Sequence, residues 1–360
     1  MTDTTQKRTS RAAVFSAVGQ PLQIRNVDLP VPAAGEALVR ITCCTICGSD
    51  LHTLSGHRHS PMPTVLGHEI IGVLESFAGE PLQDVSGQPL HVGDRVTWSV
   101  AASCGTCARC VAGLPQKCQT LFKYGHELFE PGTELSGGLA DYCVLKRGTA
   151  IVRLSPDADD QLYCPANCAT ATVAAAVRLA GALHQKRVAV CGAGMLGLTT
   201  CAFAAAQGAA EICVCDLNEN RRLFAQRFGA TKTGPELTTD DFDVVFEMSG
   251  SPAAVEAAIQ AAGIGGRVLL VGSVSPSPAV AVDPERVVRR LLSIQGVHNY
   301  RPDDLLSAVR FLDAHGTSFP FAELVERSFP LTAVDEAFDY AVQERPIRVA
   351  VRPRDHDSDA

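Results

Sequence analysis

The stretch RVAVCGAGMLG, residues 187–197, decides the fold of this 360-residue chain. Its first four residues read as a short apolar strand, and Gly192, Gly194 and Gly197 then form a GxGxxG loop before an alanine-rich segment. Glycines at these positions let the backbone approach a pyrophosphate, which the N-terminus of the following helix attracts. The strand, loop and helix together predict a dinucleotide-binding βαβ unit.

An aspartate follows at the expected distance. The next apolar run, EICVCD, ends at Asp216, nineteen residues after Gly197. A carboxylate there accepts hydrogen bonds from a ribose diol and repels a 2′-phosphate, so we expect NAD rather than NADP. Arg221 and Arg222 follow closely and keep NADP open as an alternative, because an arginine can bind the 2′-phosphate.

The pattern of expected secondary structure changes near residue 165. Before it, short strand-like runs such as EALVRITCC (36–44) alternate with turn clusters such as SGQPLHVGDRV (86–96). From about 170 to 297, apolar strands alternate with alanine-rich helices, which predicts a parallel sheet covered on both faces. We therefore expect an α/β protein with a β-rich domain over 1–169 and 298–360, and a doubly wound domain over 170–297. The strand-like PIRVAVRP (346–353) can return to the first domain, and we expect RDHDSDA (354–360) to be a frayed tail.

The composition excludes several classes of function. The net charge of −8 offers no basic surface for a nucleic acid. The first fifteen residues lack the apolar core of a signal peptide, and no window approaches eighteen uninterrupted apolar residues, so we expect a cytoplasmic protein that does not bind a membrane. The fourteen cysteines should then be reduced thiols rather than disulfides.

Four of these cysteines lie within fifteen residues. The segment CGTCARCVAGLPQKC (104–118) contains Cys104, Cys107, Cys110 and Cys118. Four thiolates can enclose one Zn²⁺ in a closed tetrahedron, which is a structural site without an open position for chemistry. The alternatives are an iron–sulfur cluster, buried cysteines without a ligand, and a redox switch that releases zinc on oxidation.

A second group of ligand types is spread along the chain. The motifs CGSDLH (47–52), GHE (67–69) and NCATAT (167–172) contribute Cys47, His68 and Cys168, with Cys164 as a rival for the third position. A catalytic zinc site needs three protein ligands and an open fourth position. These three side chains supply the right atoms for it.

Read in order, CGSDLH, GHE, GDRV, the four-cysteine segment, CGAGMLG and VCD resemble the zinc-dependent alcohol dehydrogenases of the medium-chain dehydrogenase/reductase superfamily over nearly the whole chain. The resemblance implies a GroES-like catalytic domain, a Rossmann domain that binds NAD, one catalytic and one structural zinc ion per chain, and a homodimer or homotetramer. The site residues that it implies are Cys47, His68 and Cys168 as catalytic zinc ligands, Glu69 as a carboxylate that approaches the metal during ligand exchange, Asp50 as the residue that orients His68, Ser49 and His52 as a proton relay, and Arg348 as a contact to the cofactor pyrophosphate.

The expected reaction is the reversible oxidation of a small-molecule alcohol to an aldehyde or ketone. The segment GHRHSPMP (56–63) matches one that lines the substrate pocket in the family, and we expect Arg58 within it, together with Lys123, to bind an anionic group. The alternative is that the Arg58 and Lys123 side chains are solvent-exposed charges on loops. The stretch SIQGVHNYRPDDL (293–305) is similar to dehydrogenases associated with phosphonate catabolism, which makes a hydroxyalkylphosphonate or its aldehyde one candidate.

Other functions stay open at this point. A polyol or amino-alcohol dehydrogenase is the nearest alternative, and a non-catalytic zinc-binding protein that kept the fold is a more distant one. A zinc-free quinone or enoyl reductase of the same fold would have no use for Cys47, His68 and the four-cysteine segment.

Overall fold

The computed structural model describes residues 8–353, so the first seven residues and the expected tail at 354–360 lie outside it. The chain divides into two compact units. The first comprises the described residues up to Cys168, Arg301–Leu306 and those from Ala322 onward, and the second comprises Ala169–Tyr300 and Ser307–Phe321. The second unit thus includes residues 298–300 and 307–321, which the sequence pattern predicts in the first domain.

The first unit is built on β-structure. One sheet has the order β16-β17-β3-β5-β6-β7, with β8 paired to β3 and β9 paired to β6, and a smaller sheet has the order β2-β1-β4. The strands are β1 (Thr9–Phe15), β2 (Gln23–Asp28), β3 (Ala37–Thr45), β4 (Thr64–Val65), β5 (Glu69–Phe77), β6 (Arg95–Ala102), β7 (Phe122–Lys123), β8 (Tyr142–Leu145), β9 (Thr149–Arg153), β16 (Val325–Pro330) and β17 (Arg348–Arg352). The short helices are α1 (Gly48–Leu54), α2 (Ala108–Val111), α3 (Asp160–Tyr163), α10 (Val334–Gln343) and the 3₁₀ turns η1 (Pro115–Lys117), η2 (Cys164–Asn167) and η4 (Leu331–Ala333).

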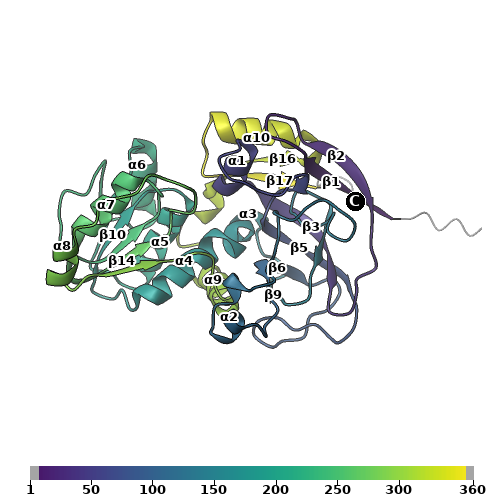
Figure 1. The fold of residues 1–360 in the computed structure, drawn as a ribbon, viewed down its shortest axis with the longest axis horizontal. Helices are drawn as coiled ribbons and strands as arrows, with labels where there is room; N and C mark the ends of the chain where they lie inside the picture. Colours follow the sequence, from purple (N-terminus) through teal and green to yellow (C-terminus); the bar gives the residue numbers. More distant parts are fainter. Residues whose placement is uncertain (1–7, 354–360) are drawn as a thin grey trace, which may run out of the picture. The chain divides into compact units, whose positions relative to one another are not determined.

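The expected return strand is present. β17 pairs in antiparallel fashion with β3, through Ala350 opposite Thr45 and Val351 opposite Cys44, and in parallel fashion with β16. Figure 1 shows these yellow C-terminal strands beside the purple N-terminal ones. The end of the described chain therefore completes the sheet from which the strand β3 leads into Cys47.

The second unit contains a parallel sheet. Its order is β12-β11-β10-β13-β14-β15, and every neighbouring pair is parallel. The elements are α4 (Ala169–Ala180), β10 (Arg187–Cys191), α5 (Met195–Ala206), β11 (Glu211–Cys215), α6 (Glu219–Arg227), β12 (Lys232–Gly234), β13 (Phe242–Glu247), α7 (Pro252–Ala261), β14 (Ala262–Leu270), α8 (Pro284–Arg289) and β15 (Ser293–Gly296). The helix α9 (Pro302–His315) and the turn η3 (Phe321–Leu324) contribute residues to both units. The strand order reverses between β10 and β13, and ligands of such sheets bind beyond the carboxyl ends of the strands at that point.

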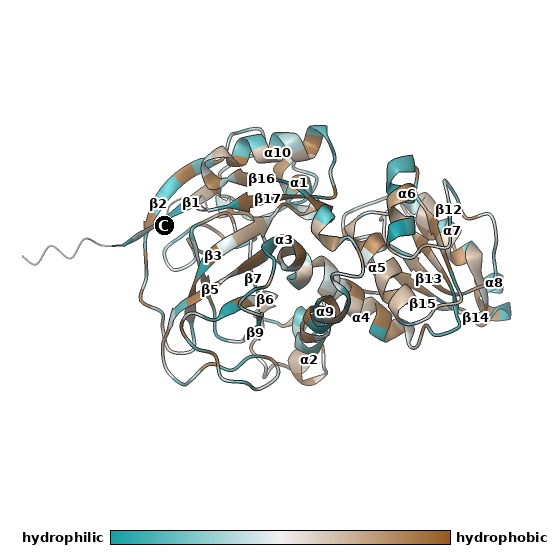
Figure 2. Cartoon of the chain, turned by 180° about the vertical axis from the view of Figure 1, so that it is seen from behind, coloured by the Kyte–Doolittle hydropathy of each residue, from teal (hydrophilic) through white to brown (hydrophobic). Residues whose placement is uncertain are grey.

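Each unit has its own apolar core. Trp98, Tyr124 and Phe15 are fully buried in the first, and Phe242 and Val245 in the second. Figure 2 shows brown, hydrophobic residues along β5 and β13 and teal, hydrophilic residues on α6. None of the helices within residues 8–353 is both long enough and apolar enough to cross a membrane.

Candidate functional site

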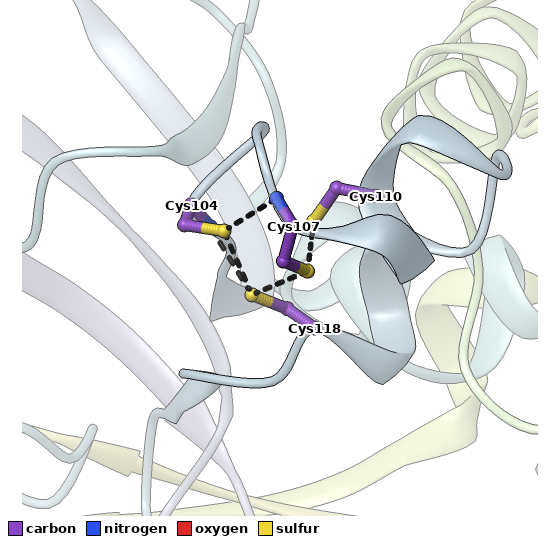
Figure 3. Close-up of side chains that lie close together, drawn as sticks. All are labelled: Cys104, Cys107, Cys110 and Cys118. Atoms are coloured by element: carbon purple, nitrogen blue, oxygen red, sulfur yellow. Dashed lines mark hydrogen bonds between the residues drawn. The ribbon is translucent and has the colours of Figure 1, made fainter.

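The four-cysteine segment folds its thiols into one cluster. Figure 3 shows Cys104, Cys107, Cys110 and Cys118 pointing toward a common centre. The Sγ atoms of Cys104 and Cys118 are 3.4 Å apart, those of Cys107 and Cys110 are 3.5 Å apart, and those of Cys107 and Cys118 are 3.9 Å apart. A tetrahedron with Zn–S bonds of about 2.3 Å has S–S edges of about 3.8 Å. The thiols are therefore spaced for one metal ion, and all four are free of disulfides.

The backbone around this cluster favours thiolates. The N–H of Cys107 donates to Sγ of Cys104, and the N–H of Cys104 donates to Sγ of Cys118, each at 3.3 Å. Hydrogen bonds from the backbone at Thr106 and Cys107 lower the pKa of Cys104 to about 5. This ready ionisation suits a metal site, because the thiolate is the ligand form of cysteine.

The second group of predicted ligands also meets. The ligand atoms of Cys47, His68 and Cys168 all lie within 4.8 Å of one another. Cys47 precedes α1, His68 precedes β5 and Cys168 follows η2, so three separate segments converge. The rival Cys164 is buried, and its thiol donates to the backbone oxygen of Glu69 at 3.2 Å. Three donors of two chemical types fit a zinc site that keeps a fourth position open.

One buried carboxylate holds two of these segments. Oδ1 of Asp50 lies 3.3 Å from Nδ1 of His68 and accepts the Gly67 N–H at 3.3 Å. Oδ2 of Asp50 accepts the Cys47 N–H at 2.9 Å. A carboxylate on the outer nitrogen of a ligand histidine fixes the orientation of its ring and leaves Nε2 for the metal.

The electric field at this point favours a cation. Contact with Cys168, assisted by the charge of Arg348, holds the pKa of Cys47 well below its usual range. Burial would lower the pKa of His68, but the negative charges of Asp50 and Cys47 outweigh it and raise the pKa to about 10. Because the field stabilises a proton on the imidazole, it stabilises a divalent cation between the same groups for the same reason.

Glu69 is held in a buried ion pair. Nε and Nη2 of Arg348 donate to its two carboxylate oxygens at 2.7 and 2.8 Å, and Thr45 Oγ1 donates to Oε2 at 2.6 Å. Nη2 of Arg348 also lies 3.7 Å from Sγ of Cys47. The guanidinium is thus engaged beside the metal ligands, and its predicted contact with the cofactor pyrophosphate stays a prediction.

The predicted proton relay lies on α1. Ser49 Oγ is 3.3 Å from Nε2 of His68, and His52 follows one turn later with an exposed side chain. The Ser49 hydroxyl and the His52 imidazole therefore lie on one short helix that runs from the ligand set to solvent.

Sequence reasoning missed the role of Asn167. The side chain is fully buried, and its Nδ2 donates to the carbonyl oxygens of His68 at 2.9 Å and Trp98 at 2.7 Å. Its Oδ1 accepts the Ile70 N–H at 3.2 Å. Asn167 therefore ties the segment that ends in Cys168 to the segment that carries His68, and only its position next to Cys168 hinted at this.

The predicted substrate residues lie near the ligand set. Arg58 and Lys123 are both half-buried, and within residues 8–353 neither side chain has a hydrogen bond or an ion pair. Burial, together with the charge of Arg58, lowers the pKa of Lys123 to about 8, and the charge of Cys168 opposes this. The charges of Arg58 and Cys168 thus both act on Lys123. A further buried side chain near them, His126, was not predicted, although the tripeptide GHE occurs at 125–127 as well as at 67–69.

In the second unit, the glycine loop has the geometry that its sequence predicts. Gly192 has φ of +100°, and a Cβ on Gly197 would lie 1.8 Å from the Gly192 oxygen. Gly194 precedes the first residue of α5, and a Cβ there would meet open space. The helix start is therefore exposed in the way that phosphate binding requires.

Asp216 braces this loop. Its Oδ2 accepts the Ala193 N–H at 2.7 Å and its Oδ1 accepts the Asn218 N–H at 2.8 Å. The Arg221 N–H donates to Asn218 Oδ1 at 3.2 Å, and Nη1 of Arg222 donates to the Asp216 backbone oxygen at 2.8 Å. Asp216 thus lies directly beyond β11, beside the loop, as the dinucleotide motif requires.

Comparisons with known proteins match both units. Residues 33–156 match the family described as the alcohol dehydrogenase GroES-like domain, and residues 196–314 match the zinc-binding dehydrogenase family. The chain is 28% identical to 5-exo-hydroxycamphor dehydrogenase of Pseudomonas putida over 92% of this chain and 95% of that protein. It is 30% identical to L-threonine 3-dehydrogenase of Deinococcus deserti over 81% of this chain and 82% of that protein.

Solved structures have the same fold. An alcohol dehydrogenase from Thermotoga maritima matches with a TM-score of 0.90 at 24% identity, over 96% of this chain and all of that one. A zinc-binding dehydrogenase from Sinorhizobium meliloti bound to NADP matches with a TM-score of 0.84 at 26% identity, over 96% of this chain and 100% of that one.

These matches cover the segments that carry the four-cysteine cluster, Cys47, His68 and the strand and helix around Asp216. The four-cysteine cluster is the structural metal site, and Cys47, His68 and Cys168 form the catalytic one. With both metal sites and the dinucleotide loop in place, the chain belongs to the zinc-dependent alcohol dehydrogenases of the medium-chain dehydrogenase/reductase superfamily, which are NAD(P)-dependent oxidoreductases.

Proposed function

We propose that this dehydrogenase is NAD-linked and oxidises an alcohol that carries an anionic group. One observation carries the proposal: Arg58 and Lys123 are half-buried, their side chains have no partner among residues 8–353, and the charge of a metal ligand acts on Lys123. The donors Cys47, His68 and Cys168 lie within 4.8 Å of one another, and the charge of Cys168 acts on Lys123. Half-burying Arg58 and Lys123 without a counter-charge is unfavourable, and an anionic ligand would offset that cost.

Different residues of the chain have different roles in the reaction. Zinc held by Cys47, His68 and Cys168 would supply a Lewis acid that lowers the pKa of the alcohol hydroxyl, and NAD held at the glycine loop would take up the hydride. Ser49 receives the hydroxyl proton, since its Oγ lies at the edge of the ligand set, 3.3 Å from Nε2 of His68. His52, exposed one turn further along α1, passes that proton to solvent. Asp50 keeps His68 in the orientation that binding requires.

The preference for NAD over NADP rests on Asp216. A carboxylate that already braces the glycine loop through Ala193 would repel a 2′-phosphate. Arg222 is engaged with the backbone of Asp216 and Leu217, so its guanidinium is committed to this turn. The NADP in the Sinorhizobium meliloti relative marks the alternative, in which Arg221 binds the phosphate.

Two anionic substrate classes deserve comparison. A hydroxyalkylphosphonate, or the aldehyde formed from it, would place two or three oxygens on Arg58 and Lys123. A 2-amino-3-hydroxy acid is the second candidate, because L-threonine, named for the Deinococcus deserti relative, carries a carboxylate two carbons from its hydroxyl group. Both classes use the same two cations, and they differ in the group next to the alcohol carbon.

The assembly and location are further parts of the proposal. We expect a homodimer or homotetramer, supported by the edge strand β15 and by the exposed apolar residues Ile264, Val288 and Leu291 of the same unit. Fourteen free cysteines support a reducing, cytoplasmic location. We also infer that the β-rich unit is the catalytic domain and that the parallel-sheet unit is the cofactor domain.

An NAD-linked activity screen tests the substrate class. The purified protein, with about two zinc ions per chain confirmed by metal analysis, is assayed with 2-hydroxyethylphosphonate and L-threonine beside neutral alcohols of similar length. We expect kcat/KM to favour an anionic alcohol and Arg58→Ala to remove that preference, while Arg153→Ala, at an exposed arginine, keeps it. Equal turnover of neutral and anionic alcohols, or an equal loss of both in Arg58→Ala, would reduce the substrate class to an unspecified alcohol.

A further inference from the structure

The turn that carries Lys123 is docked against the loop that carries His68. Gly125 has φ of +76°, and a Cβ there would lie 2.7 Å from the Gly67 oxygen, so only glycine allows this close approach. The Gly125 N–H donates to the Ser136 oxygen at 2.9 Å, and the Lys123 N–H donates to Oε1 of Glu127 at 2.6 Å. The next residue, His126, is therefore held at a set distance from the metal ligands.

The His126 side chain faces the catalytic metal site. Its ring centroid lies 5.6 Å from that of His68, with an angle of 30° between the two rings. The residue is only 8% exposed, and its Nδ1 is completely buried without a hydrogen-bond partner. Within residues 8–353, no side-chain hydrogen bond or ion pair involves either ring nitrogen.

The surroundings of His126 are positively charged. The charges of Lys123 and Arg58 both act on its imidazole, and the charge of Cys47 opposes them. A neutral imidazole offers one donor and one acceptor nitrogen. An unpartnered buried imidazole is unfavourable, and a polar ligand that hydrogen-bonds it would recover that free energy.

We propose that His126 determines substrate specificity together with Arg58 and Lys123, by donating a hydrogen bond to the anionic group of the alcohol. We call these three residues the anion pocket. The inference rests on the proposed function and extends it: Arg58 and Lys123 supply charge, whereas His126 supplies a directed hydrogen bond from a turn fixed by Gly125. His126 acts on the group that is not oxidised, so its effect belongs to substrate binding rather than to hydride transfer.

The test compares ring chemistry with ring shape in the zinc-loaded enzyme. His126→Phe keeps an aromatic ring and removes both nitrogens, and His126→Gln keeps a donor and an acceptor near the position of Nε2, the ring nitrogen that is not completely buried. The readout is the kcat/KM for 2-hydroxyethylphosphonate, or for the best anionic alcohol of the screen, divided by the kcat/KM for a neutral alcohol of the same length. We expect His126→Phe to lower this ratio about ten- to a hundredfold, mainly through KM, because hydrogen bonds to charged groups contribute about 1.5–3 kcal/mol. We expect His126→Gln to keep the ratio within about threefold.

Controls separate specificity from folding. His91→Phe changes an exposed histidine and should leave the ratio as in the wild type. Zinc content and thermal unfolding are measured for every variant. If His126→Phe fails to fold, His126→Ala with added imidazole replaces it, and we expect imidazole to restore the ratio.

Each outcome decides the matter. An unchanged ratio in a zinc-loaded His126→Phe, or an equal loss for both alcohols, would overturn the role of His126 while the substrate class stands. A wild-type enzyme that shows no preference for anionic alcohols would already overturn the proposed substrate class, and this inference with it. A lower ratio in His126→Phe with recovery in His126→Gln supports the inference.

Discussion

Replacing Asn167 with alanine tests how the catalytic metal site is held together. The wild-type side chain makes at least three buried hydrogen bonds, to the oxygens of His68 and Trp98 and to the Ile70 N–H. Alanine can make none of them. The change removes the side-chain amide that links the residue before Cys168 to the His68–Ile70 segment and to Trp98.

The expected cost follows from these bonds. A typical hydrogen bond contributes about 1 kcal/mol net, and a buried partner left unsatisfied costs about 1–3 kcal/mol. Asn167, Ile70 and Trp98 are all fully buried, so water cannot replace the lost amide without rearrangement. We therefore expect the free energy of unfolding to fall by about 3–5 kcal/mol, a large share of the stability of a domain.

Urea denaturation and zinc retention measure the two consequences. Asn167→Ala should unfold at lower urea concentration, and it should lose the catalytic zinc to a chelator faster than the wild type, because the amide link between the His68 and Cys168 segments is lost. Asn220→Ala, at an exposed asparagine on α6, should change stability by no more than about 0.5 kcal/mol. A loss below about 1 kcal/mol in Asn167→Ala, with zinc retained as in the wild type, would refute this account of the site.

Three further predictions concern the other parts of the enzyme. Cys107→Ser should lower zinc content by about one ion per chain and lower the melting temperature, with activity tracking the folded fraction; a stable variant that holds both metals but is inactive would contradict a structural role. Asp216→Ser should raise the NADP to NAD ratio of kcat/KM about tenfold or more, since a ribose acceptor and a repulsive charge are both lost, and a wild type that already prefers NADP would show that Arg221 dominates. Because the pKa of Lys123 is lowered to about 8, its cation is present below that pH and lost above it, so KM for an anionic alcohol should rise between pH 7 and 9. Lys123→Arg should flatten that rise, and a flat wild-type profile would contradict the assignment.

The parts of the site that could be predicted from the sequence are encoded locally. The spacing of Cys104, Cys107 and Cys110 brings three thiols to one turn, and the glycine loop from Gly192 to Gly197 needs no distant residue to take its shape. The choice between Cys168 and Cys164 could not be made this way, because it depends on the η2 turn and on a contact between Cys164 and Glu69.

Other features depend on long-range pairing. His126 and His68 are brought together by the fit of Gly125 against Gly67, which no spacing reveals. The Arg348 to Glu69 ion pair likewise needed the return of β17 to β3. The strand β17 could be predicted from its apolar pattern. The pairing of its first residue, Arg348, with Glu69 could not.

The ion pair between Glu69 and Arg348 also determines when the catalytic site can be completed during synthesis of the chain. Glu69 and Arg348 are separated by 279 positions, and a ribosome makes the chain from the N-terminus. The whole parallel-sheet unit is synthesised between them and can fold while the first unit still lacks β16 and β17. Until Arg348 emerges, the Glu69 carboxylate has no guanidinium to neutralise it and cannot be buried in its final form. The catalytic centre is therefore completed only after the parallel-sheet unit has been made.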